Sequence, residues 1–517
     1  MKRPLLHFAC TLFFLPLFLQ AQQLPYPILF CTQVPNPNGF GSSMETFGNH
    51  NASMDAIPRG GDLYIRYPDG SLKNLTQLAG FGQNGMQGAT AIAVRDPHVH
   101  WSGQKALFSM VVGAPTQQYQ VNTYYWQLYE VTGLAQNDTP TIPLVPNQPA
   151  NYNNVNPIYG TDGRIIFATD RARGGYAHLY PQLDEYETAR TVTGIWRLDP
   201  TACNMADGLE MLTHAPSGDF TPIIDQAGRV VFTRWDHLQR DQQADADIMY
   251  NAGYGTFNYV SEAANALKFD IYPDIEVFPE PRGSRTDLLA LPEWQDFNGQ
   301  TFNIFNPWMM NEDGTDLEML NHIGRHEMGG NYFEENLSGD PNLHYFNSAE
   351  APTDNPIRSM FHLHESPTTP GLFYGTEAGE FGSHASGMIV SMLAPPGTNP
   401  ELVEINHITH PETRSPDSNP MPEHTGLYRD PLPLSNGQVL AMHTSETDYD
   451  ENIGSSAMPL SRYDYRLRLL VPHTGVYLKA DTLNNLTGAG ISKTVSWWSP
   501  DRSEERRVGK ECRSRWS

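Results

Sequence analysis

A short pattern of polar and hydrophobic positions recurs along the chain. The copies begin with a polar residue and proline, alternate briefly, turn at a glycine and continue into an apolar strand. Because glycine readily takes a positive φ between two strands, each copy predicts a β-hairpin. The copies are DPHVHWSGQKALF (Asp96 to Phe108), NPIYGTDGRIIF (Asn156 to Phe167), TPIIDQAGRVVF (Thr221 to Phe232) and the looser DPLPLSNGQVLAMHT (from Asp430), with turns at Gly103, Gly163, Gly228 and Gly437.

The spacing of the copies predicts the architecture. The first three hairpins recur at intervals of roughly 60 to 65 residues, as expected for a supersecondary unit that is repeated along the chain. Segments with helical periodicity are nearly absent. We therefore predict an all-β fold, a β-propeller of six to seven four-stranded blades with long loop insertions. A solenoid is the alternative, although its repeats are typically shorter and stricter.

Other segments fit the same plan. The segment from Gly61 to Thr76 predicts a hairpin, and so does the one from Asn306 to Leu320, which turns at Asp313-Gly314. A further blade is expected to begin near Gly371. The irregular, charged stretch 241–300 is interpreted as an insertion carried on one blade.

The N-terminus has the pattern of a secretory signal peptide. Lys2 and Arg3 precede an apolar run from Leu5 to Leu19, and Ala21 offers a small residue for cleavage. We expect residues 1–21 to be removed, leaving the propeller in residues 22–501 without a membrane span. The expected location is the periplasm or the outside of the cell.

The C-terminal segment 502–517 differs sharply from the rest of the chain. It holds six basic and three acidic residues, whereas the whole chain has 33 basic and 58 acidic residues. Its string RSEERRVGKECRSRWS resembles the translation of a common sequencing adapter. We interpret it as an artefact and expect the natural protein to continue beyond Asp501, because Trp498 to Asp501 reads as the start of another repeat.

The charge of the chain limits its partners. The formal net charge is −25 at pH 7, and no basic stripe is present to meet phosphates. A nucleic-acid partner is therefore not expected. A protein or a small molecule bound at one face of the propeller is the expected kind of partner, although a fold alone does not define a function.

The repeats resemble those of a known class of exported bacterial proteins. The phrases W-S-x-x-G…F, M-N-x-D-G-T-D and L-T are similar to TolB-like, WD40-like (PD40) propeller repeats. The order of features also resembles the middle-domain family of the hydrazine synthase alpha subunit, which implies a propeller fold. The matching segments are Gly61 to Tyr64, the Asp96 repeat, Tyr159 to Phe167, Phe232 to Asp236, Met310 to Leu320 and Asp430 to Leu434.

Cysteine usage bears on haem and on disulfides. The resemblance to the hydrazine synthase alpha subunit implies covalent haem, which needs a C-x-x-C-H motif. Cys31, Cys203 and Cys512 stand far apart in the sequence, and none of them begins such a motif. No cofactor is therefore evident. In an oxidising compartment Cys31 and Cys203 could form a disulfide, and two unbonded thiols are the alternative.

Two pairs of histidines are weak candidates for metal ligands. His98 with His100, and His362 with His364, are spaced so that both side chains of a pair lie on the same face of a strand. Solvated polar side chains are the simpler interpretation, and we assign no metal site.

Three other motifs are weaker. His326-Glu327 starts like a zinc-protease helix, but Gly330 stands where the second histidine is needed. The segment from Gly382 to Gly387 contains serines but lacks the G-x-S-x-G spacing of a nucleophile elbow, so we expect a loop between strands. Arg234 to His237 follows a predicted strand, and we expect either a buried Arg–Asp pair or a ligand contact.

These observations favour an exported binding or scaffolding module over an enzyme. No catalytic residue is assigned. The alternative is the propeller part of an enzyme, either a redox-complex subunit or a hydrolase, whose catalytic domain lies beyond Asp501.

Overall fold

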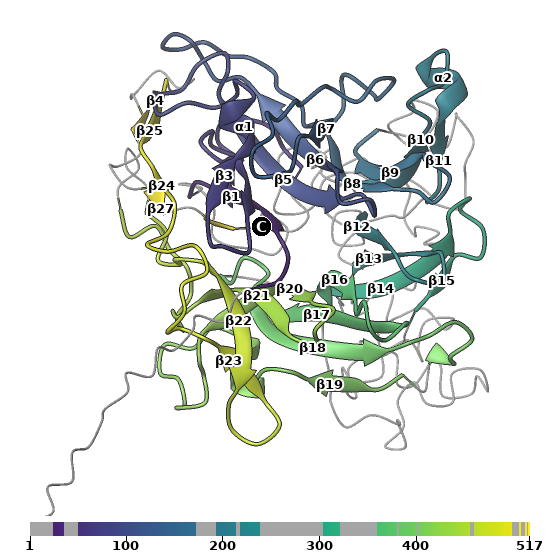
Figure 1. Ribbon diagram of the computed structural model, residues 1–517, viewed down its shortest axis with the longest axis vertical. Helices are drawn as coiled ribbons and strands as arrows, with labels where there is room; N and C mark the ends of the chain where they lie inside the picture. Colours follow the sequence, from purple (N-terminus) through teal and green to yellow (C-terminus); the bar gives the residue numbers. More distant parts are fainter. Residues whose placement is uncertain are drawn as a thin grey trace, which may run out of the picture.

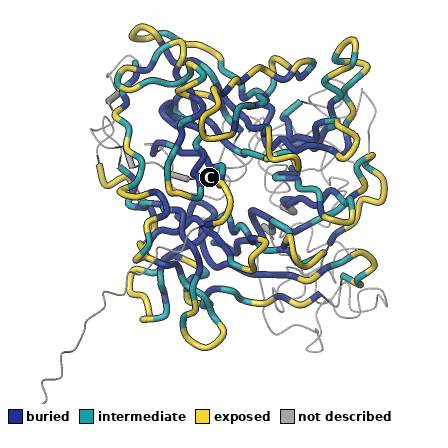
Figure 2. The backbone as a smooth tube through the Cα atoms, in the orientation of Figure 1, coloured by how far each residue is buried: buried dark blue, intermediate teal, exposed yellow. Residues whose placement is uncertain are grey.

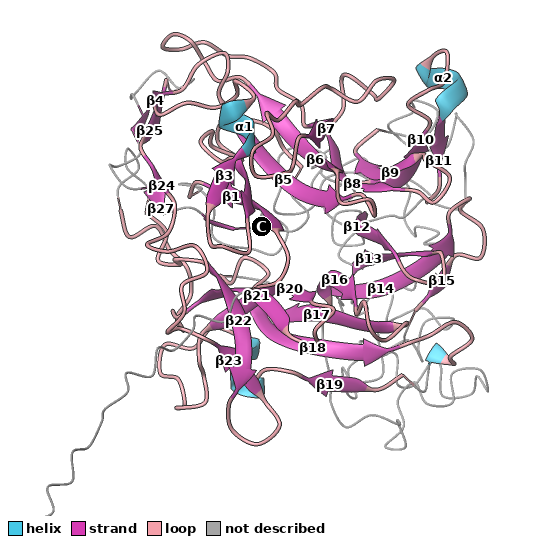
Figure 3. Cartoon of the chain, viewed as in Figure 1, coloured by secondary structure: helices cyan, strands magenta, loops and turns pink. Residues whose placement is uncertain are grey.

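The computed structural model describes residues 24–35, 50–171, 193–213, 218–237, 303–320, 359–379, 382–400, 403–454 and 460–498, with three two-residue strands near the C-terminal end. These residues are almost entirely strand and turn, as Figure 3 shows. Helical structure is limited to single turns, including α1 (Leu75–Leu78) and α2 (Met205–Gly208). The predicted all-β class is therefore confirmed. The predicted signal peptide, the predicted insertion at 241–300 and His326-Glu327 lie outside the described residues.

Antiparallel sheets follow one another along the sequence. In the first three the neighbouring strands are consecutive in the chain, apart from a two-residue strand near the C-terminal end that joins the edge of the first sheet. The first sheet contains β1 (Ile28–Gln33), β2 (Leu63–Arg66) and β3 (Leu72–Asn74). The second contains β5 (Ile92–Val99), β6 (Lys105–Val112) and β7 (Gln127–Thr132). The third contains β8 (Asn154–Tyr159), β9 (Ile165–Thr169), β10 (Gly194–Leu198) and β11 (Leu209–Met211).

The second half of the chain repeats this arrangement. The fourth sheet contains β12 (Asp219–Ile224), β13 (Arg229–His237), β14 (Asn303–Asn311) and β15 (Glu318–Met319). The fifth group contains β16 (Phe361–Glu365), β17 (Leu372–Ala378), β18 (Gly387–Leu393) and β19 (Ile405–His407). The sixth contains β20 (Leu427–Pro433), β21 (Val439–Thr444), β22 (Arg466–Pro472) and β23 (Leu478–Ala480). One residue pair, Gly387 with Tyr428, joins the fifth and sixth groups.

The remaining strands are short. The short strand β25 (Val495–Trp497) pairs in parallel with β4 (Gly85–Met86), which lies between β3 and β5 in the chain. The C-terminal part of the described chain therefore lies against a segment near the N-terminus. Residues 506–516 contribute three two-residue strands that pair with β25, β24 and β1. The six remaining strands of the described chain are β4 (Gly85–Met86), β24 (Ser492–Lys493), β25 (Val495–Trp497), β26 (Arg506–Arg507), β27 (Cys512–Arg513) and β28 (Arg515–Trp516).

The four predicted hairpins are present, with turns at the predicted glycines. The φ angles are 69°, 85°, 85° and 81° at Gly103, Gly163, Gly228 and Gly437. Residues other than glycine rarely adopt such positive values. Each of these glycines lies between the first and second strands of a sheet. The period-two pattern and the turn chemistry of the sequence therefore specify these hairpins locally.

The fifth group begins earlier than predicted. The sequence placed the start of a blade near Gly371, but β16 precedes it and pairs with β17. The strand was missed because its segment, FHLHE, lacks the proline and the glycine turn that mark the other copies. As a result, His362 and His364 lie on the first strand of a sheet.

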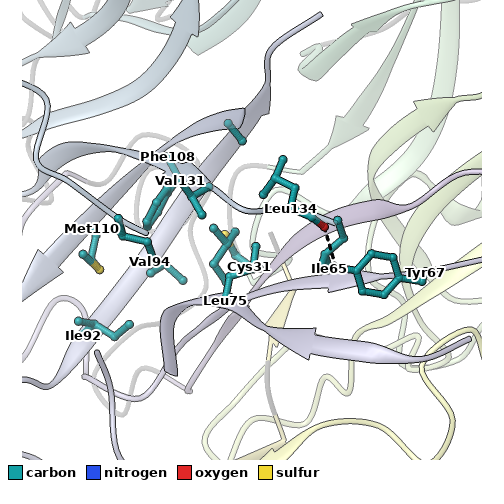
Figure 4. Packing of buried hydrophobic residues seen from close by; sticks show 13 residues of the cluster. Cys31, Ile65, Tyr67, Leu75, Ile92, Val94, Phe108, Met110, Val131 and Leu134 are labelled. Atoms are coloured by element: carbon teal, nitrogen blue, oxygen red, sulfur yellow. Dashed lines mark hydrogen bonds between the residues drawn. The ribbon is translucent and has the colours of Figure 1, made fainter. Parts of the chain in front are cut away.

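Hydrophobic side chains between adjacent sheets form the core. Figure 4 shows the layer between the first and second sheets, where Ile65 lies beside Leu134, Phe108 and Met110 belong to the same buried cluster, and the Tyr67 hydroxyl donates to the Leu134 carbonyl at 2.6 Å. In Figure 2 the buried residues follow the strands and the exposed residues follow the loops. Each sheet is therefore stabilised by its neighbours.

The first and sixth sheets also pack against each other. Ile28 and Phe30 of β1 belong to the same buried cluster as Leu440 and Leu469 of β21 and β22. Figure 1 shows the same arrangement, with β1 and β3 beside β21 and β22 and the other sheets following one another around the molecule. Residues at opposite ends of the sequence therefore share one core. Among the described residues, no helix is long and apolar enough to cross a membrane.

We expect the repeated phenylalanine to be a major source of stability. Phe167 is fully buried, so replacing it with alanine removes apolar contacts and leaves a cavity. The Phe167→Ala variant should lose about 3–5 kcal/mol of unfolding free energy in chemical denaturation. Val476→Ala is the control, because Val476 is 84 % exposed and its loss should change stability by about 0.5 kcal/mol or less. Equal effects of the two substitutions would contradict the assignment of this core.

Candidate functional site

The first strands of five consecutive sheets share a β-bulge. In each, the pairing register with the second strand shifts by one extra residue, and a non-glycine residue with positive φ stands at the shift. An extra residue of this kind bends the strand and redirects its side chain. We call these five positions the bulge residues. They are Asp96, Asn156, Thr221, His362 and Asp430, with φ angles of 55°, 53°, 49°, 54° and 49°.

The bulge residues lie where the sheets meet. The first strands β5, β8, β12, β16 and β20 pack against one another in chain order, and their labels surround the middle of Figure 1. Proline follows four of the five bulge residues. A positive φ is unfavourable for residues with a Cβ and costs on the order of 1–3 kcal/mol each. Strain repeated at equivalent positions of five strands indicates that these positions share a role.

Two of the bulges carry the same Arg-Asp-Pro sequence and the same ion pair. Arg95 Nε donates to Asp96 Oδ2 at 2.6 Å, and Arg429 Nε donates to Asp430 Oδ2 at 2.7 Å. The side chains of Asp96 and Asp430 are 19 % and 21 % exposed, whereas those of both arginines are buried. Each carboxylate therefore has an arginine on its buried side.

Hydrogen bonds link the bulges to one another. The backbone N–H of Asn156 donates to Asp96 Oδ2 at 3.2 Å, which joins the second and third sheets. Arg429 joins the fifth and sixth groups, because its Nη2 contacts His362 Nε2 at 3.1 Å and its Nη1 donates to the His384 carbonyl at 2.9 Å. His362 Nε2 is also 3.6 Å from Asp430 Oδ1. The polar groups thus form contacts across sheets.

Three buried polar atoms on these first strands have no hydrogen-bond partner in the described part of the chain. They are His98 Nδ1 on β5, Asn156 Oδ1 on β8 and Thr221 Oγ1 on β12. Asn156 as a whole is only 4 % exposed. An unpaired buried polar atom costs about 1–3 kcal/mol, so an occurrence on three adjacent strands calls for an explanation.

The histidines of this region are uncharged at neutral pH. Burial lowers the pKa of His98 to about 4, with a further contribution from the nearby His364 and His100. Burial likewise lowers the pKa of His362 to about 3, although Asp430 opposes the shift. Burial raises the pKa of Asp430, but Arg429 and His362 outweigh it and the net shift is downward. Asp430 is therefore ionised and the imidazoles are neutral.

The structure places the predicted histidine pairs differently from the sequence interpretation. His98 lies close to His364 on another first strand, while His100 packs against the exposed Trp101 with tilted rings whose centroids are 4.0 Å apart. His362 contacts Arg429, as described above. In the described residues, no group of three or more His, Cys, Asp or Glu side chains is arranged to hold a metal ion.

The predicted disulfide is not present in the structure. Cys31 is buried in β1, whereas Cys203 is exposed beside α2, and no disulfide joins the two. The prediction rested on the oxidising compartment and not on geometry. The two positions belong to different sheets, and the sequence carried no information on their separation.

The buried Arg–Asp pair expected at Arg234 has a different partner. Arg234 lies inside β13, not after it, and its Nε and Nη2 donate to Asp219 of β12 at 2.7 and 3.1 Å. The guanidinium also stacks over Trp308 at 4.2 Å. The pair therefore connects two adjacent strands of the fourth sheet, two residues before the bulge at Thr221.

The serine-containing segment at Gly382 is a loop between β17 and β18, as predicted. His384 and Ala385 both have positive φ, at 54° and 55°. His384 Nε2 contacts Asp450, and the hydroxyl of Ser461 donates to the same carboxylate at 2.8 Å. Ser461, which lies outside this segment, thus bonds to the acid and not to the imidazole, and Ser383 within the segment donates to the Gly379 carbonyl at 2.9 Å. Neither arrangement has the order of a hydrolytic triad. The loop instead presents the His384 carbonyl to Arg429.

Sequence reasoning missed the bulge residues as a group. The polar-proline opening of each repeat was their signal in four strands, but it was interpreted only as part of a hairpin. His362 has no such signal, because leucine follows it. Only the structure shows that the five positions are equivalent.

Comparison with known proteins adds limited information. No protein-family model matches the chain, and no curated protein matches it. Similar solved structures include hydrazine synthase of Kuenenia stuttgartiensis (13 % identity, TM-score 0.46, covering 87 % of this chain and 44 % of that one) and a puromycin hydrolase (11 %, 0.31, 87 % and 58 %). Another is a putative TolB of Agrobacterium tumefaciens (13 %, 0.19, 57 % and 88 %).

The predicted resemblance is confirmed in part. Hydrazine synthase and a TolB protein are both among the similar structures, but no family model supports the PD40 repeat assignment. The chain spans about half the length of the first two structures. At these identities and TM-scores the similarities carry no argument about activity.

The strain at the bulges can be measured at Thr221. A β-branched residue is especially unfavourable at φ 49°, so Thr221→Gly should raise the unfolding free energy by about 1 kcal/mol. Thr132→Gly in β7 is the control, because Thr132 is not among the residues with positive φ and glycine there should destabilise by about 1 kcal/mol. Chemical denaturation compares the two. A similar destabilisation by both substitutions would show that Thr221 is not strained.

Stability should depend on the protonation of His362. Its pKa lies near 3 in the folded protein and at the ordinary value in the unfolded chain, so in the interval between them only the unfolded chain takes up the proton. Lowering the pH from 7 to 5 should therefore destabilise the fold, with about 2 kcal/mol from this residue. His362→Gln should lose less stability over the same interval than the wild type, as measured by urea denaturation at both pH values. An unchanged pH dependence would contradict the neutral, buried state.

Proposed function

We propose that this chain is an exported β-propeller that binds a small polar ligand or a polar group of a partner at the bulge residues. The six successive groups of strands are proposed to be its blades. The apolar run after Lys2 and Arg3 directs it to the periplasm or the outside of the cell. Binding, not chemistry, is the function of the part described.

One observation carries this proposal. The bulge residues stand at equivalent positions on the first strands of five consecutive sheets, all with positive φ. Residues held in unfavourable backbone conformations are concentrated at binding and active sites, where the surrounding fold stabilises them. Here the strain redirects five polar side chains, and it leaves three polar atoms of β5, β8 and β12 without partners. A bound polar ligand explains both features.

The geometry favours binding over catalysis. Between β21 and β22, the Ser461 hydroxyl donates to the Asp450 carboxylate. In a hydrolytic triad the serine would instead hydrogen-bond to a histidine base. The two arginine side chains at the bulges are engaged with the adjacent carboxylates. A preorganised set of acceptors and donors on rigid strands is typical of a binding site.

A thermal-shift experiment tests the proposal with three ligands of different charge. Glucose, succinate and n-butylammonium chloride are added in increasing concentration to the purified chain. A ligand that binds only the folded state raises the melting temperature by mass action. We expect at least one of the three to do so.

The location of binding is tested with a double variant. Asn156→Ala with Thr221→Val removes two of the unpartnered atoms and should abolish the shift. The control is Asn147→Ala, because Asn147 also has positive φ (63°) but lies in the loop between β7 and β8. No shift with any ligand, or an equal shift in the double variant, would overturn the proposal.

A further inference from the structure

We propose that the bulge residues bind a primary ammonium group, supplied by a small amine or by a lysine side chain. This inference rests on the proposed binding function and adds the chemical class of the ligand. Some polar atoms at the site are already engaged within the protein, and others are not.

The hydrogen-bond donors of the site are largely engaged within the protein. All three nitrogens of Arg429 have partners, namely Asp430 Oδ2, the His384 carbonyl and His362 Nε2. Arg95 donates through Nε to Asp96. An anionic ligand needs free donors, and the arginine that would be its natural partner is already committed on every nitrogen.

The acceptors of the site remain open. Asn156 Oδ1 and Thr221 Oγ1 are buried oxygen atoms without partners in the described part of the chain. The Asp96 carboxylate lies next to Asn156, because its Oδ2 accepts the backbone N–H of that residue. These three oxygen-bearing side chains stand on the successive first strands β5, β8 and β12. An ammonium group has three N–H donors and no acceptor, which matches such a set.

The charge around the site agrees with a cation. Arg95 and Arg429 are offset by the carboxylates of Asp96 and Asp430, and His98 and His362 are neutral, so these side chains carry no net positive charge. The whole chain has a formal charge of −25, so its long-range field attracts cations. A metal ion is a poorer match, because no three His, Cys, Asp or Glu side chains of the described residues are arranged to hold one.

Titration calorimetry with n-butylammonium tests the inference. The neutral isostere 1-butanol, succinate and calcium chloride are the comparison ligands, at constant ionic strength. We expect saturable binding of n-butylammonium only. Thr221→Val keeps the shape and the β-branch while removing one acceptor, and it should weaken this binding roughly tenfold, as loss of a hydrogen bond to a charged group does.

A second variant guards against an effect of misfolding. Asn156→Asp places a carboxylate at an acceptor position and should strengthen n-butylammonium binding, which an unfolded variant would not do. Asn147→Asp, outside the first strands, should leave the affinity unchanged. If glucose or succinate binds and the double variant abolishes that binding, the proposed function stands and the ammonium inference is wrong. If calcium binds instead, the ligand is a metal ion, and if nothing binds, both proposals fail.

Discussion

When one strand of a pair carries an extra residue, that residue leaves the ladder and its side chain no longer follows the alternation of the strand. In this protein the extra residue occurs on the first strand of five consecutive sheets, where the sheets meet. The placement of Asp96, Asn156, Thr221, His362 and Asp430 depends on this one constraint. The remaining contacts of the region follow from it, because each redirected side chain has to find a partner or remain exposed to a ligand.

The arginines show how such a region is stabilised. A buried guanidinium is costly unless its donors are satisfied, and Arg429 satisfies them with a carboxylate, an imidazole nitrogen and a loop carbonyl. The loop that supplies the carbonyl is itself strained at His384 and Ala385. The bulge at Asp430 and the loop before β18 are therefore energetically coupled, although 45 residues separate Arg429 from His384 in the sequence.

The hairpins could be predicted from the sequence because their causes are local. Gly103 and Gly437 mark turns through their own conformational freedom, and the apolar residues after them specify a buried strand. The start of β16 could not be predicted, because FHLHE carries no such signal. The proximity of His98 to His364 depends on how separate sheets pack, and the partner of Arg234 lies on another strand. Neither relation is contained in the spacing of residues along one strand.

The hairpin turns have a practical consequence for studying this molecule. A methyl group placed on Gly103, Gly163, Gly228 or Gly437 would meet no atom within 4 Å apart from its chain neighbours, so each turn projects into open space, although the positive φ favours glycine itself. The turns are attached to the same strands that carry the bulge residues at Asp96, Asn156, Thr221 and Asp430. They offer four equivalent attachment points for spectroscopic probes or inserted peptides, each close in sequence to one bulge but outside the packed layers between the sheets.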